Sequence, residues 1–166
     1  MAHFTGAIGP TGALIDVTFW VSSARLAALK AEAQPVPDAC HGRALLDTGA
    51  SSTAIDPSVL KALELPPLGT IPVLTPSTGN VPHDASLYDV SIAIPPALAG
   101  EQALVFPRVP VTASQLLESQ GIHALVGRDV LARCVLIWNG AYGQFTLCCC
   151  RSCKTAVFWT GIDRSQ

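Results

Sequence analysis

The residues best suited to chemistry gather in one short segment, where three apolar residues run into Asp47 and a hydroxyl, a glycine and a small residue follow at once. This pattern predicts a buried strand that ends with a carboxylate on a tight turn. Moving an isolated carboxylate out of water is costly unless the group is paired, hydrogen-bonded or neutralised. Asp47 therefore either accepts hydrogen bonds from the amides of its own turn or takes part in a reaction.

A second segment, residues 122–131, has a similar pattern of an apolar strand followed by a glycine. Its apolar strand closes on Gly127, after which Arg128 and Asp129 open an apparent helix. The two stretches, Leu-Leu-Asp-Thr-Gly-Ala and then Ala-Leu-Val-Gly-Arg-Asp-Val-Leu, occur in the order that is typical of one family. The chain resembles the retropepsin-like aspartic proteases over roughly residues 5–148, with the decisive positions at 45–52 and 125–131.

The resemblance implies a mainly β fold, a retropepsin-like closed β-barrel with a few short helices and one lobe per chain. It also implies that Asp47 is the catalytic residue of an aspartic endopeptidase. A flap hairpin that closes over the substrate corresponds to part of residues 71–94. The supporting positions are Thr48, Gly49, Ala50, Gly127 and Arg128, and the substrate-binding flap candidates are Ser77, Thr78, Gly79 and Asn80.

The chemistry of this family needs two carboxylates that share one proton, so that one activates a water molecule while the other protonates the carbonyl oxygen. The sequence holds a single Asp-Thr-Gly. The second carboxylate is therefore expected from another copy of the chain, which predicts a homodimer that acts on extended polypeptides. No cofactor and no metal are needed.

Two features depart from the family pattern. Many viral members carry an acid where this chain has Ser51, and that acid pairs with the arginine of the helix motif. Arg128 must then bind Asp56, Asp129 or backbone carbonyl groups. The expected flap tip holds one glycine rather than several. These departures support an alternative in which the chain is a catalytically weak or inactive retropepsin-like module for dimerisation or peptide binding.

A third hypothesis, a metal or redox module, rests on the run Cys148-Cys149-Cys150-Arg151-Ser152-Cys153. A structural zinc site needs four ligands, and neither a second Cys-x-x-Cys nor a helical pair of histidines lies nearby. The favoured interpretation is therefore ordinary thiols and no metal site. His123, between apolar residues, is expected to be a packed or surface residue rather than a base.

Length and composition set further limits. The length of 166 residues predicts a single domain. The resemblance implies a retropepsin-like aspartic protease domain over 1–150, followed by a cysteine-containing tail over 151–166. Hydrophobic residues reach 49% and charged residues only 13%, so an apolar interface is expected. A net charge of −2 offers no field for nucleic acid. Because neither a secretory leader nor a long apolar span is apparent, a cytoplasmic chain with reduced thiols and no membrane partner is expected.

Periodicity and turn residues predict the remaining elements. Strands are expected at 15–22, 42–46, 103–111 and 124–126. Hairpins are expected at 71–75 with 87–94 and at 135–138 with 145–148, the second with its turn at Asn139-Gly140 and Gly143. Short helices are expected at 23–32, within an insertion that spans 23–38, and at 128–134. Another is expected at 56–63, with Asp56 as its N-cap and Pro57 as its first helical residue, and a fourth at 112–120, where Thr112 and Gln115 have capping-box spacing.

Overall fold

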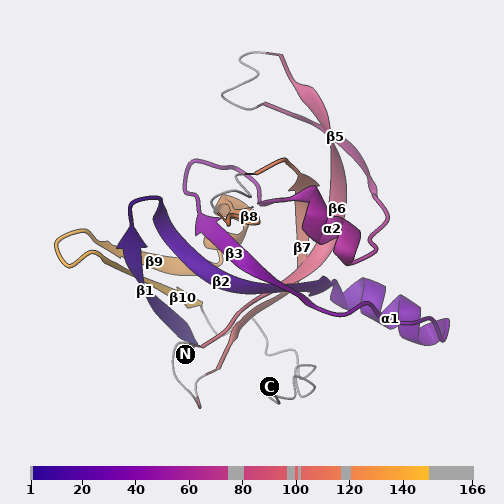
Figure 1. The fold of residues 1–166 in the computed structure, drawn as a ribbon, viewed down its shortest axis with the longest axis horizontal. Coiled ribbons are helices and arrows are strands. Elements are labelled where there is room, and N and C mark those ends of the chain that lie inside the picture. Colours follow the sequence, from indigo (N-terminus) through magenta and orange to yellow (C-terminus); the bar gives the residue numbers. More distant parts are fainter. Residues whose placement is uncertain (1, 75–80, 97–99, 101, 117–120, 150–166) are drawn as a thin grey trace.

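The structure, a computed structural model, describes residues 2–74, 81–96, 100, 102–116 and 121–149. This part of the chain forms ten strands and three short helices (Figure 1). They are β1 (His3–Gly9), β2 (Gly12–Val21), α1 (Ser23–Ala31), β3 (Cys40–Leu46), β4 (Ala54–Ile55), α2 (Pro57–Ala62), β5 (Gly69–Val73), β6 (His83–Ile94), β7 (Leu104–Ala113), β8 (Ala124–Val126), α3 (Arg128–Leu131), β9 (Cys134–Asn139) and β10 (Gln144–Cys149).

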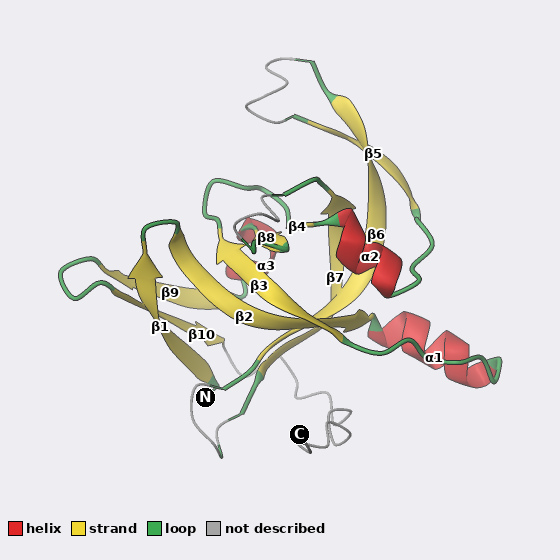
Figure 2. Ribbon diagram, in the orientation of Figure 1, coloured by secondary structure: helices red, strands yellow, loops and turns green. Residues whose placement is uncertain are grey.

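The strands form one sheet in the order β5-β6-β7-β4-β8-β3-β2-β1-β10-β9 (Figure 2). An additional pairing of β6 with β2 closes six of these strands, β6, β7, β4, β8, β3 and β2, into a barrel. Closure leaves these six strands without an open edge, while β5 on one side and β1, β10 and β9 on the other extend the sheet beyond the barrel. The predicted class, mainly β with a closed barrel and a few short helices, is confirmed.

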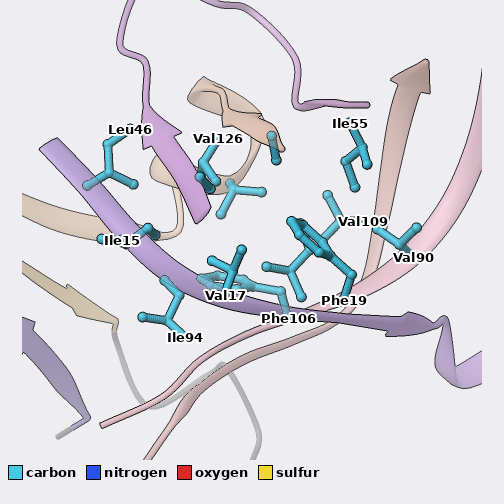
Figure 3. Close-up of a cluster of buried hydrophobic side chains, with 14 of the residues drawn as sticks. Ile15, Val17, Phe19, Leu46, Ile55, Val90, Ile94, Phe106, Val109 and Val126 are labelled. Carbon is cyan, nitrogen blue, oxygen red and sulfur yellow. The ribbon is translucent and has the colours of Figure 1, made fainter. Parts of the chain in front are cut away.

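The barrel interior is filled by apolar side chains that alternate along the strands. In β2 the residues Ile15, Val17 and Phe19 are all at most 2% exposed. They meet Phe106 from β7 and Val126 from β8 inside the barrel (Figure 3). Because successive side chains of a strand point to opposite faces, the period-two pattern predicted which side chains of β2 are buried, but not their partners in the other strands.

The hairpin of β5 and β6 differs in register from the prediction. β5 pairs with the first part of β6, from Gly69 opposite Leu87 to Val73 opposite His83. The later residues of β6 pair instead with β7 and β2. The strong alternation over 87–94 therefore belongs to the part of β6 that forms the barrel wall. The flap arm contains the less apolar first residues of β6, from His83 to Leu87.

The helix predicted over 112–120 is wrong at its start, because Thr112 and Ala113 end β7. The backbone amide of Thr112 donates to the carbonyl of Thr53 at 3.1 Å, so it joins a sheet rather than a helix cap. No helix forms at 114–116, and residues 117–120 lie outside the described part of the chain. The helix predicted over 128–134 is shorter, since α3 ends at Leu131 and Cys134 begins β9.

Two of the three helices begin at a side-chain cap, and the cap of α2 is the predicted one. Ser22 precedes α1 and accepts a hydrogen bond from the amide of Arg25 at 3.2 Å. Asp56 caps α2, with Pro57 as the first helical residue. Within the described segments no helix is long and apolar enough to cross a bilayer.

Candidate active site

Two parallel strands bring the two sequence motifs together. β3 and β8 are neighbours that run in the same direction, with Leu46 opposite Val126. Residues that follow parallel strands emerge at the same edge of a sheet, so Asp47 and Gly127 leave the barrel side by side. The amide of Asp47 continues the pairing by donating to the carbonyl of Val126 at 3.0 Å.

Asp47 is partly exposed, and its two carboxylate oxygens have different surroundings. Oδ1 accepts hydrogen bonds from the amides of Gly49 at 2.8 Å and Ala50 at 3.2 Å. Among the described residues no donor reaches Oδ2. The turn therefore fixes the orientation of the carboxylate through one oxygen and leaves the other available to a water molecule or a second acid. Both functions that the sequence suggested for Asp47 are thus compatible with this geometry.

Gly127 holds the helix motif against the aspartate loop. A Cβ atom built on Gly127 would lie 2.5 Å from the backbone carbon of Ser52 and 2.6 Å from its oxygen. Real Cβ atoms do not approach a backbone this closely, so any side chain here would push the two loops apart. Since the backbone of Gly127 is extended, this requirement is steric rather than conformational.

Arg128 binds backbone carbonyls, which decides between the acceptors that the sequence left open. Its amide donates to the carbonyl of Ala50 at 3.0 Å, and its guanidinium Nη1 donates to the carbonyl of Thr48 at 3.2 Å. The side chains of Asp56 and Asp129 make other contacts. Arg128 therefore fixes the Asp47 loop without the acid that Ser51 replaces.

Thr53 and Asp129 form a second connection between the same two loops. The carboxylate of Asp129 accepts from the Thr53 amide at 3.0 Å and from the Thr53 hydroxyl at 2.8 Å. The same hydroxyl accepts from the amide of Gly127 at 3.1 Å. Thr53 is fully buried, so its amide and hydroxyl cannot bond water, and the Asp129 carboxylate and the Gly127 amide provide their hydrogen-bond partners instead. The sequence analysis did not identify Thr53 as a supporting residue, and its position shortly after the Asp-Thr-Gly motif is the only sequence signal that could have indicated it.

Comparison with known proteins identifies the family. A family model described as aspartyl protease matches residues 35–130, which include Asp47 and the helix motif up to Val130. The chain belongs to this aspartyl protease family. The resemblance inferred from the two motifs is thereby confirmed. Among curated proteins no sequence match was found. A similar solved structure is a retropepsin-like aspartic protease from Rickettsia conorii, with 15% identity, 87% of this chain and 89% of that chain covered, and a TM-score of 0.49.

Replacing Thr53 by Val is expected to destabilise this aspartyl protease fold by about 1–3 kcal/mol, because it leaves the Gly127 amide and the Asp129 carboxylate without the hydroxyl. Thermal melting measures the effect. Thr5→Val is the matched control, since the Thr5 hydroxyl bonds Thr146 on the exposed surface at 2.9 Å. An equal change in melting temperature for both variants would show that the Thr53 hydroxyl does not hold the loops together.

Asp56 stabilises the start of α2 and, in the described part of the chain, makes no hydrogen bond to the Asp47 loop. Its Oδ1 accepts from the amide and hydroxyl of Ser58 at 2.9 and 2.7 Å, and its Oδ2 accepts from the amide of Leu116 at 3.1 Å. Burial raises the pKa of this carboxyl, but these hydrogen bonds outweigh burial and hold the pKa below its ordinary 3.8. Its contribution to stability is therefore complete above that ordinary pKa and is lost as the pH falls through the lowered value.

His123 is a packed residue, as expected. Its ring lies against Gly42, where a Cβ atom would come within 3.0 Å of the ring. Its Nδ1 accepts a hydrogen bond from the amide of Arg43 at 3.2 Å. The histidine thus joins β3 to the segment that leads into β8.

The structure describes the two strands of the predicted flap but not its tip. β5 and β6 form an arm that extends away from the barrel (Figure 1). The predicted tip residues Ser77, Thr78, Gly79 and Asn80 lie outside the described residues. On either side of the tip Leu74 and Val81 are 63% and 71% exposed. The arm therefore presents apolar side chains at the base of its tip.

The cysteine run is described only as far as Cys149. Within the described ranges no group of three or more potential metal ligands comes together. Cys40, Cys134, Cys148 and Cys149 are not joined by disulfides in this structure.

Proposed function

We propose that this chain is an aspartic endopeptidase that hydrolyses extended polypeptides as a homodimer, with Asp47 of each protomer in one shared active site. The main support is the carboxylate of Asp47, which is oriented by its own turn through Oδ1 and accepts no hydrogen bond at Oδ2 among the described residues. A carboxylate held in this way is oriented to bind a water molecule, but the reaction also needs a second carboxylate beside it. One Asp-Thr-Gly per chain makes a second copy the simplest source of that acid.

In the proposed reaction the two carboxylates share one proton, because two like charges at close distance do not both ionise. The ionised member takes a proton from a water molecule, and the water oxygen bonds to the peptide carbonyl carbon. The protonated member gives its proton to the carbonyl oxygen. When the tetrahedral intermediate collapses, the acid that holds the proton gives it to the nitrogen, the carbon–nitrogen bond breaks and the amine leaves. A hydroxyl group of the intermediate returns its proton to the other carboxylate as the new carbonyl group forms. The two acids end with one proton between them, as they began.

The β9–β10 hairpin offers a surface for the second copy. β9 is the last strand of the sheet, so among the described residues no strand pairs with its outer backbone groups. Val135, Ile137 and Trp138 on β9 are each more than half exposed, and Tyr142 in the turn is 80% exposed. Residues 135–150 carry no charged side chain. An uncharged apolar edge of this kind favours pairing with an identical edge about a two-fold axis.

Ile137→Lys tests this surface. The change is expected to weaken the dimer by at least about 100-fold, because a lysine would be buried at the shared edge without a partner. Sedimentation at several concentrations measures the dissociation constant. Ala27→Lys on α1 is the control, since it adds the same charge at an exposed site on a helix that lies away from β9 (Figure 1). If both variants dimerise like the wild type, β9 is not the interface.

The function itself is tested by incubating the protein with a denatured polypeptide between about pH 4 and 7, the range in which an aspartate pair holds one proton. Cleavage that is absent in Asp47→Asn and is reduced by a pepstatin-like compound, whose hydroxyl occupies the place of the tetrahedral oxygen, supports the proposal. The replacement of the family acid by Ser51 favours an alternative, an inactive dimerisation or peptide-binding module. Dimers that bind peptide but do not cleave it at any pH would support that alternative.

We further place the enzyme in the cytoplasm, where its six cysteines would remain largely reduced. Neither a nucleic acid nor a membrane is part of the proposal. Fractionation of cells that express the full chain tests the location.

A further inference from the structure

Two cysteines face each other across the base of the β9–β10 hairpin. Cys134 begins β9, Cys149 ends β10, and the two are direct partners in the strand register. Direct partners in an antiparallel pair project their side chains from the same face of the sheet. Cys149 belongs to the hydrophobic core, and the partly exposed Cys134 packs against that core. Both thiols therefore lie on the inner face of the hairpin.

The hydrogen bonds of Cys149 indicate how closely the two cysteines approach. Its amide donates to the carbonyl of Ala2 at 3.4 Å, on the side of β1. The amide and carbonyl of one strand residue point to the same side, so Cys149 and Cys134 form a pair without hydrogen bonds between them. The Cα atoms of such pairs lie about 4.5 Å apart, within the range of about 4.4–6.8 Å that a disulfide can span.

We infer that Cys134 and Cys149 form a disulfide site, closed by exchange with a low-molecular-weight disulfide such as oxidised glutathione. The thiolate of Cys134, which retains some exposure, attacks one glutathione sulfur and releases the first glutathione thiol. The thiolate of Cys149 then attacks the sulfur of Cys134 and releases the second. The two cysteines are oxidised, one glutathione disulfide is reduced to two thiols, and the protons of the cysteines pass to the leaving thiols.

Closing this bond changes two features of the hairpin. The Cys134 thiol no longer donates to the carbonyl of Val130, which it reaches at 3.8 Å in the reduced chain. The link also ties the last strand to the residue that begins β9, shortly after α3, which restricts the unfolded chain. The oxidised protein is therefore expected to melt about 5 °C higher than the reduced protein.

The test uses the folded full chain, incubated with reduced or with oxidised glutathione, alkylated, and digested without reduction for mass spectrometry. A peptide that joins Cys134 to Cys149 is expected only after oxidation, together with the rise in melting temperature. Cys148→Ser should keep both, because Cys148 is the register partner of His3 and Val135 and points to the opposite face.

Cys134→Ser should lose both the linked peptide and the rise. It changes a partly exposed residue and so does not depend on whether the buried Cys149 tolerates replacement. Two unlinked cysteines after oxidation, or links from Cys149 to another cysteine or to a second chain, would overturn the inference. Because no peptide cleavage is measured, the result is independent of the proposed function.

Discussion

Replacing Asp47 by Asn is expected to reduce peptide cleavage by at least about 1,000-fold, because the amide cannot take a proton from water and the change removes both acids of a homodimer at once. The fold should survive. The amide oxygen of Asn can still accept the hydrogen bonds that Gly49 and Ala50 donate to Oδ1. Cleavage rates and melting curves of the two purified proteins measure both parts of this prediction.

Asp38→Asn is the matched control, since it makes the same chemical change at an exposed position in the insertion before β3. It should cleave like the wild type. Undiminished cleavage by Asp47→Asn would exclude Asp47 as the catalytic acid. A large fall in its melting temperature would instead indicate that the carboxylate serves mainly to hold its own turn.

Gly127→Ala should destabilise the fold strongly, although it adds only one methyl group. That methyl group would need the space of the Ser52 carbonyl, 2.6 Å from the Cβ position, and backbone atoms cannot rotate away as a flexible side chain can. A loss of about 3 kcal/mol or more in the free energy of unfolding is expected, which lowers the melting temperature by roughly 6–12 °C. Cleavage should fall as well, because the Asp47 loop rests on this contact.

Gly69→Ala is the control for this variant. Gly69 lies in a strand, and its Cβ position has no other atom within 4 Å. Its melting temperature should stay close to that of the wild type. If Gly127→Ala melts like Gly69→Ala, the loops are not packed as closely as the structure has them.

The sequence predicted the elements that depend on local pattern. The alternation of β2, the cap and proline of α2, and the Asn-Gly turn between β9 and β10 each specify their own conformation, and the structure contains all three. The two motifs also predicted the neighbourhood of Asp47 and Gly127, since both follow apolar strands. Each of these features depends on residues that are close together in the sequence, so each can be predicted without knowledge of tertiary contacts.

Contacts between distant residues were beyond local pattern. The capping-box spacing from Thr112 to Gln115 suggested a helix, but Thr112 pairs with Leu87 of β6 and Ala54 of β4, so β7 continues to Ala113. Thr53 and Asp129 are 76 positions apart, so their hydrogen bonds had no signature in either segment. Arg128 binds a backbone carbonyl, and every residue provides one, which is why the sequence could not choose its acceptor.

Mixing wild type with Asp47→Asn tests the central claim, a site shared between two copies, most directly. A fixed amount of wild type is equilibrated with increasing variant under conditions that allow exchange of protomers, and the cleavage rate is measured. At a ninefold excess of variant the rate should fall to about one tenth, because most wild-type chains then pair with a chain that lacks the acid. A rate that does not change at any excess would contradict the shared site and would require both acids to lie within one chain.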